Sequence, residues 1–319
     1  MFESYADVGG GTPLVRLKRL FAGHDVDVLA KLEFLNPGGS IKDRPARHVV
    51  RQWLRQGVLR PGMRVVESTS GNFGVALAAQ ARAHDLACTL VVDPLVRPLN
   101  LALMRQHGAE VVQVDRKDSQ GGYLHTRLAE VHRILAADPR AVWVNQYANP
   151  LNWQAHYEGT GEELVADLPG PPDHLVVALS TGGSLMGTAR RLRESYPDVE
   201  VVAVDAVGSV IFGGPAGPRR IPGIGASRRP ELLDTDLVDR VVHVTDDESA
   251  AGCHDLLAAE SIMAGGSSGS VVAAIRKLLP RLRPGARVVT LFPDRGERYF
   301  DVIYQADPVV EPLHAHLIG

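Results

Sequence analysis

The stretch HLVVALSTGGSLMGTARRLRE, residues 174–194, joins an apolar run to a glycine-rich turn and then to a segment of helical period. The first part is rich in valine and leucine, and the last part places apolar residues three and four positions apart. Strand, turn and helix in this order form the repeating unit of α/β folds, in which helices cover parallel strands. The turn at 180–184 has the glycines and hydroxyls of an anion-binding loop, and simple turn chemistry accounts for it equally well.

The same unit recurs along the chain. Short β-branched runs alternate with longer segments of helical period, and the runs form two groups that separate near residue 150. This pattern predicts an α/β protein of two lobes, each with a central, mostly parallel sheet flanked by helices, and a cleft between the lobes. The expected strands are 64–68, 88–93, 110–115, 141–146, 174–180, 200–206, 240–246 and 287–294.

Composition narrows the class of protein. The 319 residues exceed the size of a single hydrophobic core, and a formal net charge of -3 argues against a broad nucleic-acid surface. Two cysteines, Cys88 and Cys253, are too few for a disulfide framework. We find no signal peptide, no membrane span and no metal-ligand spacing, so we expect a cytoplasmic protein without a metal site.

Two further strand–helix junctions carry polar clusters. The segment ESTSGNFG (67–74) places serines, a threonine and an asparagine before a helix, and AGGSSGS (264–270) places Ser267 and Ser268 before another. Helix N-caps explain one such residue each, and for the serine pair alone this is the better explanation. A third glycine bend, NPGGSIKDR (36–44), presents Lys42, although most lysines are simply solvated.

Together these features match the needs of an enzyme that uses pyridoxal 5'-phosphate. Such an enzyme requires a lysine for the Schiff base, an anchor for the phosphate and a partner for the ring nitrogen. The chain resembles the cysteine synthase family, β-replacement enzymes of fold type II with a tryptophan synthase β-like fold. The resemblance rests on seven segments in family order: NPGGSIKDR (36–44), TSGNFG (69–74), NQYANP (145–150), STGGS (180–184), PGIGAS (222–227), GGSSG (265–269) and PDRGERY (293–299).

The resemblance implies roles for particular residues. Lys42 forms the Schiff base and moves the α-proton, Asn72 holds the phenolic oxygen of the cofactor, and Ser267 faces the ring nitrogen. It also implies a smaller mobile lobe at 43–149, a larger cofactor-binding lobe at 1–42 and 150–319, and a homodimer. The phosphate loop consists of Ser180, Thr181, Gly182, Gly183 and Ser184, and the substrate carboxylate is gripped by Thr69, Ser70 and Gly71.

Several segments depart from ordinary cysteine synthases, among them Phe73, VDPLVRPLNL (92–101), GGYLHTR (121–127) and VDAVGSVIFG (204–213). They resemble the siderophore branch of the family, the N-(2-amino-2-carboxyethyl)-L-glutamate synthases. That branch joins O-phospho-L-serine, through an α-aminoacrylate, to the amine of L-glutamate on the way to 2,3-diaminopropionate. The substrate residues implied here are Arg127, Gln146, Tyr147, Ser180 and Arg228.

Anionic substrates favour arginine forks, and Arg295 and Arg298 are further candidates for such a fork. Arg127 as a solvated helix residue, Tyr147 as a packing aromatic and Ser180 as a cofactor ligand alone are the simpler explanations. Two other functions stay open at this point. One is a cysteine synthase that uses O-acetylserine or O-phosphoserine with sulfide, and the other is a non-catalytic scaffold or regulator that retains the fold. The presence of Lys42 argues against the scaffold.

Overall fold

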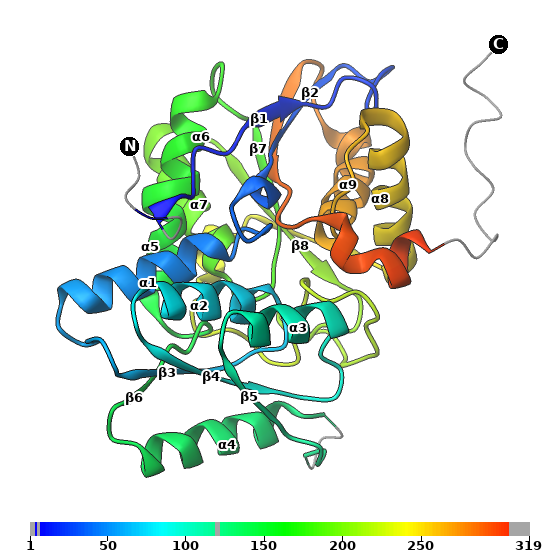
Figure 1. The fold of residues 1–319 in the computed structure, drawn as a ribbon. Helices are drawn as coiled ribbons and strands as arrows, with labels where there is room; N and C mark the ends of the chain where they lie inside the picture. The colour runs from blue at the N-terminus through cyan, green and yellow to red at the C-terminus, as the bar shows by residue number, and fades with distance from the viewer. Residues whose placement is uncertain (1–3, 5–6, 119–121, 306–319) are drawn as a thin grey trace.

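The computed structural model describes residues 4, 7–118 and 122–305, which fold around two β-sheets (Figure 1). The larger sheet has the strand order β1-β2-β10-β7-β8-β9, and the smaller has the order β5-β4-β3-β6. Neighbouring strands are parallel except β1 and β2, which pair antiparallel. The strands are β1 (Leu14–Arg16), β2 (Val26–Lys31), β3 (Arg64–Ser68), β4 (Ala87–Val92), β5 (Glu110–Gln113), β6 (Ala141–Trp143), β7 (His174–Ala178), β8 (Glu200–Ala206), β9 (Arg240–Val244) and β10 (Ala286–Leu291).

Helices cover both faces of each sheet. In Figure 1, α8 and α9 lie on one side of the larger sheet, and α4 lies on the far side of the smaller sheet from α1, α2 and α3. The α-helices are α1 (Asp43–Arg55), α2 (Asn72–Ala83), α3 (Pro98–Gln106), α4 (Leu124–Ala137), α5 (Pro150–Ala155), α6 (Glu162–Asp167), α7 (Gly183–Ser195), α8 (Asp246–Glu260) and α9 (Gly266–Leu278). Shorter helical turns are η2 (Glu33–Leu35), η3 (His156–Gly161), η4 (Thr235–Leu237), η5 (Leu279–Arg281), η6 (Gly296–Tyr299) and η7 (Phe300–Tyr304).

The strands of the larger sheet are buried on both faces, which explains their continuous apolar runs. In β7, Val176 packs into the core beneath α8 and α9, whereas Leu175 and Val177 pack into the core beneath α7. This alternation follows from the period of two in a strand. The smaller sheet likewise packs against α1 and α2 on one face and against α4 on the other.

The fold class expected from the sequence is confirmed, and each of the eight expected strands is present. Strands β1 and β2 were not expected. The smaller sheet takes all its strands from residues 64–143, and the larger sheet takes its strands from both sides of that range. The exact lobe boundaries and the mobility of the smaller lobe stay predictions.

The topology of the larger sheet collects three loops at one edge. Strands β2, β10 and β7 are parallel neighbours, so their carboxyl ends lie side by side. The chain leaves β2 toward the Lys42 bend, leaves β10 into the segment 292–295 and leaves β7 into the turn at 179–182. Open parallel sheets bind their ligands at this edge. Among the described residues, no helix is long and apolar enough to cross a membrane.

Candidate active site

Lys42 occupies the N-cap position of α1, at the end of a bend that two glycines permit. Gly39 has a φ of +77°, and a side chain on Gly38 would lie 2.4 Å from the carboxylate of Asp43. The Ile41 N–H donates to a carbonyl in the segment that follows β10, at 2.7 Å. The bend is therefore fixed against the carboxyl edge of the larger sheet.

The Lys42 amine shares a buried environment with the Asp294 carboxyl group. Burial lowers the pKa of Lys42 to about 8, and the Asp294 carboxylate opposes this shift. Asp294 is only 3% exposed, and burial raises the pKa of its carboxyl group against the hydrogen bonds from Tyr299 and Asn72. A lysine with a lowered pKa is largely neutral just above pH 8, and the neutral amine is the form that attacks an aldehyde.

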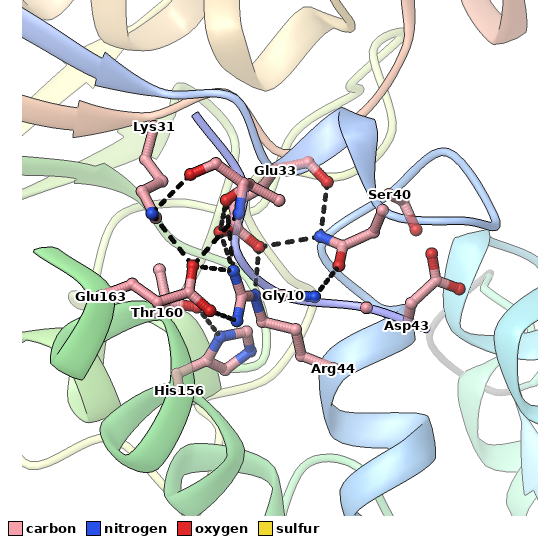
Figure 2. Close-up of polar contacts among 12 residues, drawn as sticks. Gly10, Lys31, Glu33, Ser40, Asp43, Arg44, His156, Thr160 and Glu163 are labelled. Atoms are coloured by element: carbon pink, nitrogen blue, oxygen red, sulfur yellow. Dashed lines mark hydrogen bonds and ion pairs between the residues drawn. The ribbon is translucent and has the colours of Figure 1, made fainter. Parts of the chain in front are cut away.

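A buried ionic cluster holds the first turn of α1, directly after Lys42 (Figure 2). Arg44 forms a two-pronged contact with Glu33, at 2.6 and 2.7 Å, and a second one with Glu163, at 2.7 and 2.8 Å. Lys31 adds an ion pair to Glu163 at 3.0 Å. Burial opposes the charge on Glu163, but the contacts with Arg44 lower its pKa to about 2. The cluster ties α1 to η2 and α6 and thereby fixes the position of Lys42.

The N-terminus of α7 has no side-chain cap among the described residues. Its N-cap is Gly182, with a φ of +92°, and no acidic residue stands in the first turn. Gly183 packs so closely on Asn152 that a Cβ there would lie 2.2 Å from the amide oxygen. The backbone N–H groups that begin this helix are therefore donors for a ligand. The expected phosphate loop, Ser180, Thr181, Gly182, Gly183 and Ser184, forms this turn.

Helices α2 and α9 begin in the same way, at Gly71 and Gly265, again without a side-chain cap. By contrast, α8 begins with a complete capping box formed by Thr245 and Glu248. The explanation of Ser267 and Ser268 as N-caps is therefore wrong. Three uncapped helix starts carry positive potential, which suits anionic groups of a cofactor or substrate.

Asp294 joins two of these helix starts next to Lys42. The Asn72 amide nitrogen donates to its side chain at 2.6 Å, and the Gly265 N–H donates to its backbone carbonyl at 2.8 Å. Ser267, in the first turn of α9, is 2% exposed. The structure thus brings together the expected Schiff-base lysine, the expected partner of the phenolic oxygen and the helix that carries the expected partner of the ring nitrogen.

A second chain of contacts connects the turn before α7 with the turn before α2. The Asn152 amide donates to the Gln146 carbonyl at 2.6 Å and lies 3.4 Å from the Thr181 hydroxyl. The Gln146 N–H donates in turn to Glu67 at 3.1 Å, and Glu67 stands two residues before the expected carboxylate loop of Thr69, Ser70 and Gly71. Burial raises the pKa of Glu67 to about 7, against hydrogen bonds from Gln146, Ser68 and Trp143.

Three other expected substrate residues, Arg127, Ser180 and Arg228, lie around Tyr147. The Arg228 guanidinium lies 4.4 Å from the Tyr147 ring centroid. Ser180, whose hydroxyl donates to the Gly225 carbonyl at 3.3 Å, lies next to the Tyr147 side chain. Burial raises the pKa of Tyr147, and Arg127 and Arg228 oppose the increase. Arg127 pairs with Asp93 at 3.2 Å. The Nε atoms of both arginines are buried and have no hydrogen-bond partner among the described residues, so each has a donor left for an anion.

Arg295 and Arg298, the other candidates for a substrate fork, contact the chain itself. Arg295 Nε donates to the Phe34 carbonyl at 3.2 Å, and Arg298 donates to the Gly38 carbonyl and to the Asn72 amide oxygen. These contacts brace the Lys42 bend and the start of α2. Both arginines therefore have structural partners that sequence patterns did not indicate.

The sequence also gave no indication of three buried polar residues at the site: Glu67, Asn152 and Asp294. Glu67 and Asp294 stand inside segments that were noticed for other residues, ESTSGNFG and PDRGERY. Glu67 lies within β3 and Asp294 lies three residues after β10, so an acidic residue at the end of a buried strand is a signal that could have found these two. Among the described residues, no group of three or more histidine, cysteine, aspartate or glutamate side chains could hold a metal ion.

The comparisons with known proteins agree with this geometry. Residues 5–294 match the family model described as pyridoxal-phosphate dependent enzyme, and the chain belongs to this family. Two similar relatives are the N-(2-amino-2-carboxyethyl)-L-glutamate synthases of Ralstonia nicotianae and Cupriavidus metallidurans. The first is 54% identical over 95% of this chain and 89% of its own, and the second is 53% identical over 92% and 87%.

Solved structures of similar enzymes share the fold. One is the O-acetylserine dependent cystathionine beta-synthase from Helicobacter pylori, with a TM-score of 0.88 and 31% identity over 95% of this chain and 99% of its own. Another is an O-ureido-L-serine synthase, with a TM-score of 0.89 and 32% identity over 98% of each chain. The two N-(2-amino-2-carboxyethyl)-L-glutamate synthases confirm the resemblance to that branch of the family. Together with the family model, they also confirm the expectation of an enzyme.

Proposed function

We propose that this chain binds pyridoxal 5'-phosphate and catalyses a β-replacement on O-phospho-L-serine. Phosphate leaves Cβ, the amine of L-glutamate adds to Cβ, and the product is N-(2-amino-2-carboxyethyl)-L-glutamate, a precursor of 2,3-diaminopropionate. The relatives at 53 and 54% identity carry the name of this activity. The observation that carries the proposal for this chain is the convergence of Arg127 and Arg228 on Tyr147, beside the uncapped start of α7.

The residues present fit the cofactor. A phosphate needs clustered N–H donors, which the uncapped α7 supplies, and a Schiff base needs a lysine with a lowered pKa, which Lys42 supplies. Ser267 offers a neutral hydroxyl to the ring nitrogen, and Asn72 offers an amide to the phenolic oxygen. When bound, the cofactor supplies an electron sink that weakens the bonds at the amino acid's Cα.

The chain's own side chains do the remaining work. Lys42 takes the proton from Cα and later returns it there, because its lowered pKa makes its amine a base near neutral pH. The α2 turn of Thr69, Ser70 and Gly71 holds the substrate carboxylate against an uncapped helix start.

The cationic cluster around Tyr147 selects acidic substrates. O-phosphoserine carries a phosphate that O-acetylserine lacks, and glutamate carries a second carboxylate that sulfide lacks. Arg127 and Arg228 each keep a buried Nε donor without a partner among the described residues. Hydrogen bonds from such charged donors to an anion are stronger than hydrogen bonds between neutral groups. Without an anion, these buried donors stay unsatisfied.

The test is a product assay with a colour control. Purified protein loaded with pyridoxal 5'-phosphate is mixed with O-phosphoserine and then with glutamate, or with sulfide. Mass spectrometry is expected to detect N-(2-amino-2-carboxyethyl)-L-glutamate, whereas cysteine alone would assign the chain to sulfide chemistry. Lys42→Ala is expected to lose both the visible absorbance and the product. A colourless native protein would favour the scaffold.

The homodimer and the cytoplasmic location implied by the resemblance belong to this proposal as well. The dimer can be tested on the purified protein. Light scattering coupled to size-exclusion chromatography measures the mass of the assembly against the 34.4 kDa of one chain. A mass of one chain would contradict the dimer.

A further inference from the structure

The two ends of the Asn72 amide have partners of opposite kind. The amide nitrogen donates to Asp294 Oδ2 at 2.6 Å, and the amide oxygen accepts from Arg298 Nη1. A carboxylate oxygen accepts and a guanidinium only donates, so each partner matches one end of the amide. A flipped amide would place its oxygen against the carboxylate and its NH₂ group against the guanidinium. Asp294 and Arg298 together therefore select one orientation of Asn72.

Both partners are themselves fixed. Oδ2 of Asp294 also accepts from the Tyr299 hydroxyl, and the Asp294 carbonyl accepts from the Gly265 N–H at 2.8 Å. The carboxylate packs so tightly on Gly265 that a Cβ there would lie 2.1 Å from Oδ1. Arg298 is braced in turn by its second nitrogen, which donates to the Gly38 carbonyl. The three residues Asn72, Asp294 and Arg298, called here the amide clamp, cannot rearrange without disturbing the Lys42 bend and the start of α9.

The orientation matters because the amide nitrogen carries two hydrogens and Asp294 takes only one. We propose that Asp294 and Arg298 are positioning residues that fix the Asn72 amide so that its second N–H faces the phenolic oxygen of the cofactor. This inference rests on the proposed use of pyridoxal 5'-phosphate. A flipped amide would present an acceptor to an oxygen that is itself an acceptor in its ionised form, and the hydrogen bond would become a repulsion.

The test compares substitutions on one segment. Asp294→Asn keeps the size of the side chain but offers the Asn72 amide either a donor or an acceptor. Asp301→Asn is the matched control. Asp301 lies seven residues after Asp294, pairs with Arg97 and has an exposed side chain. Each variant is titrated with pyridoxal 5'-phosphate by equilibrium dialysis, and its absorption spectrum is recorded without substrate.

Asp294→Asn is expected to bind the cofactor about tenfold more weakly, because the charge-assisted hydrogen bond from the Asn72 amide to the phenolic oxygen is lost. Its visible band is expected to lose intensity to the near-ultraviolet band, as the phenolic oxygen becomes protonated. Asp301→Asn is expected to match the native protein in both respects. In an Asn72→Ala background, Asp294→Asn is expected to cause no further loss, because a positioning residue acts only through the group that it positions.

Arg298 provides an independent arm if Asp294→Asn does not fold. Arg298→Met removes the donor to the amide oxygen and is expected to reproduce the spectral change, while Arg298→Lys retains a donor and is expected to restore most of the native spectrum. A native protein that is yellow, with both Asp294→Asn and Arg298→Met unchanged, overturns the clamp alone. A native protein that binds no pyridoxal 5'-phosphate overturns the proposed function and the clamp together. Equal changes in Asp294→Asn and Asp301→Asn also overturn the clamp.

Discussion

The Arg228 guanidinium lies over the Tyr147 ring, 4.4 Å from its centroid, and donates from its other side to Glu231 at 3.0 Å. These two contacts hold the planar guanidinium in place while its Nε stays buried without a partner among the described residues. A guanidinium that is stacked and braced loses little conformational freedom when it binds an anion. Arg228 is thus prepared for a ligand rather than simply solvated.

Arg228→Gln is therefore expected to lower kcat/KM for O-phosphoserine by about 10- to 100-fold, since a hydrogen bond to a charged group contributes about 1.5–3 kcal/mol. The neighbouring Arg229 is exposed, and its side chain donates to the Thr235 hydroxyl at 3.4 Å. Arg229→Gln serves as the control. Steady-state kinetics with both variants decide the matter, and equal losses would remove Arg228 from the substrate site.

The strands of this fold were predictable because their signal is local. Val65 and Val66 stand in an unbroken β-branched run, and β3 has the bounds that the run predicts. Strand β2 was missed because it contains Asp27 and ends at Lys31, a residue that is fully buried. The Lys31 ammonium donates to the Thr12 carbonyl at 2.6 Å, and its charge is balanced by Glu163 and Asp167, which lie more than 130 positions away in the chain. Such a partner leaves no mark in the local pattern.

The local sequence pattern also fails to predict how some of the helices begin. Serines and threonines before a helix predict N-caps on composition alone, yet Ser267 and Thr69 do not cap their helices, whose N-caps are glycines. The family resemblance implied the ligand roles of these segments, but it did not predict the amide clamp. The hydrogen bond between Asn72 and Asp294 joins residues that are 222 positions apart in the sequence, and only the folded chain brings them together.

Cofactor loading is expected to follow the titration of Lys42. Burial lowers the pKa of its amine to about 8, so the neutral nucleophile increases as the pH rises toward 8 and levels off above it. At pH 8 the neutral fraction is roughly 150 times that of an ordinary lysine with a pKa near 10.5. The rate at which colour appears after pyridoxal 5'-phosphate is added to cofactor-free protein measures this directly.

The Asp294 carboxylate opposes the lowering of the Lys42 pKa, and its removal provides a second measurement. Asp294→Asn is expected to move the midpoint of the loading rate to lower pH. Asp301→Asn is again the control and is expected to leave the midpoint unchanged. A midpoint near 10.5 in the native protein would show that Lys42 titrates as a solvated lysine, and it would contradict the lowered pKa.

Glu67 is expected to make the folded protein less stable as the pH rises. Its pKa is raised by burial from 4.5 to about 7, so between these values the folded state binds more protons than the unfolded state. The free energy of unfolding therefore falls with increasing pH across this window, by about 3 kcal/mol from this one group. Glu67→Gln removes the titration, and its unfolding free energy is expected to depend less on pH.

The comparison that isolates Glu67 is the difference between native protein and variant, because other groups titrate in the same range. Asp43, for example, has a pKa raised by burial to about 6. Urea unfolding at pH 4.5 and pH 7 gives the two free energies for each protein. A difference that is the same at both pH values would mean that Glu67 stays ionised in its buried position.

The ionic cluster around Arg44 gives the sharpest prediction for stability. Arg44→Met keeps the bulk of the side chain but leaves Glu33, which is fully buried, without its cation. Breaking a buried pair in this way costs about 3–5 kcal/mol, because an uncompensated charge stays in the interior. Arg133→Met is the matched control, since its pair with Glu130 lies on the surface, where solvent screens it, and is expected to contribute little to stability. Urea unfolding compares the two variants.

Because α1 begins directly after Lys42, Arg44→Met is also expected to weaken the binding of pyridoxal 5'-phosphate, whereas Arg133→Met is not. Equal stability losses in the two variants would mean that the cluster contributes no more than a surface ion pair, and the position of Lys42 would then depend on the Gly38 and Gly39 bend alone.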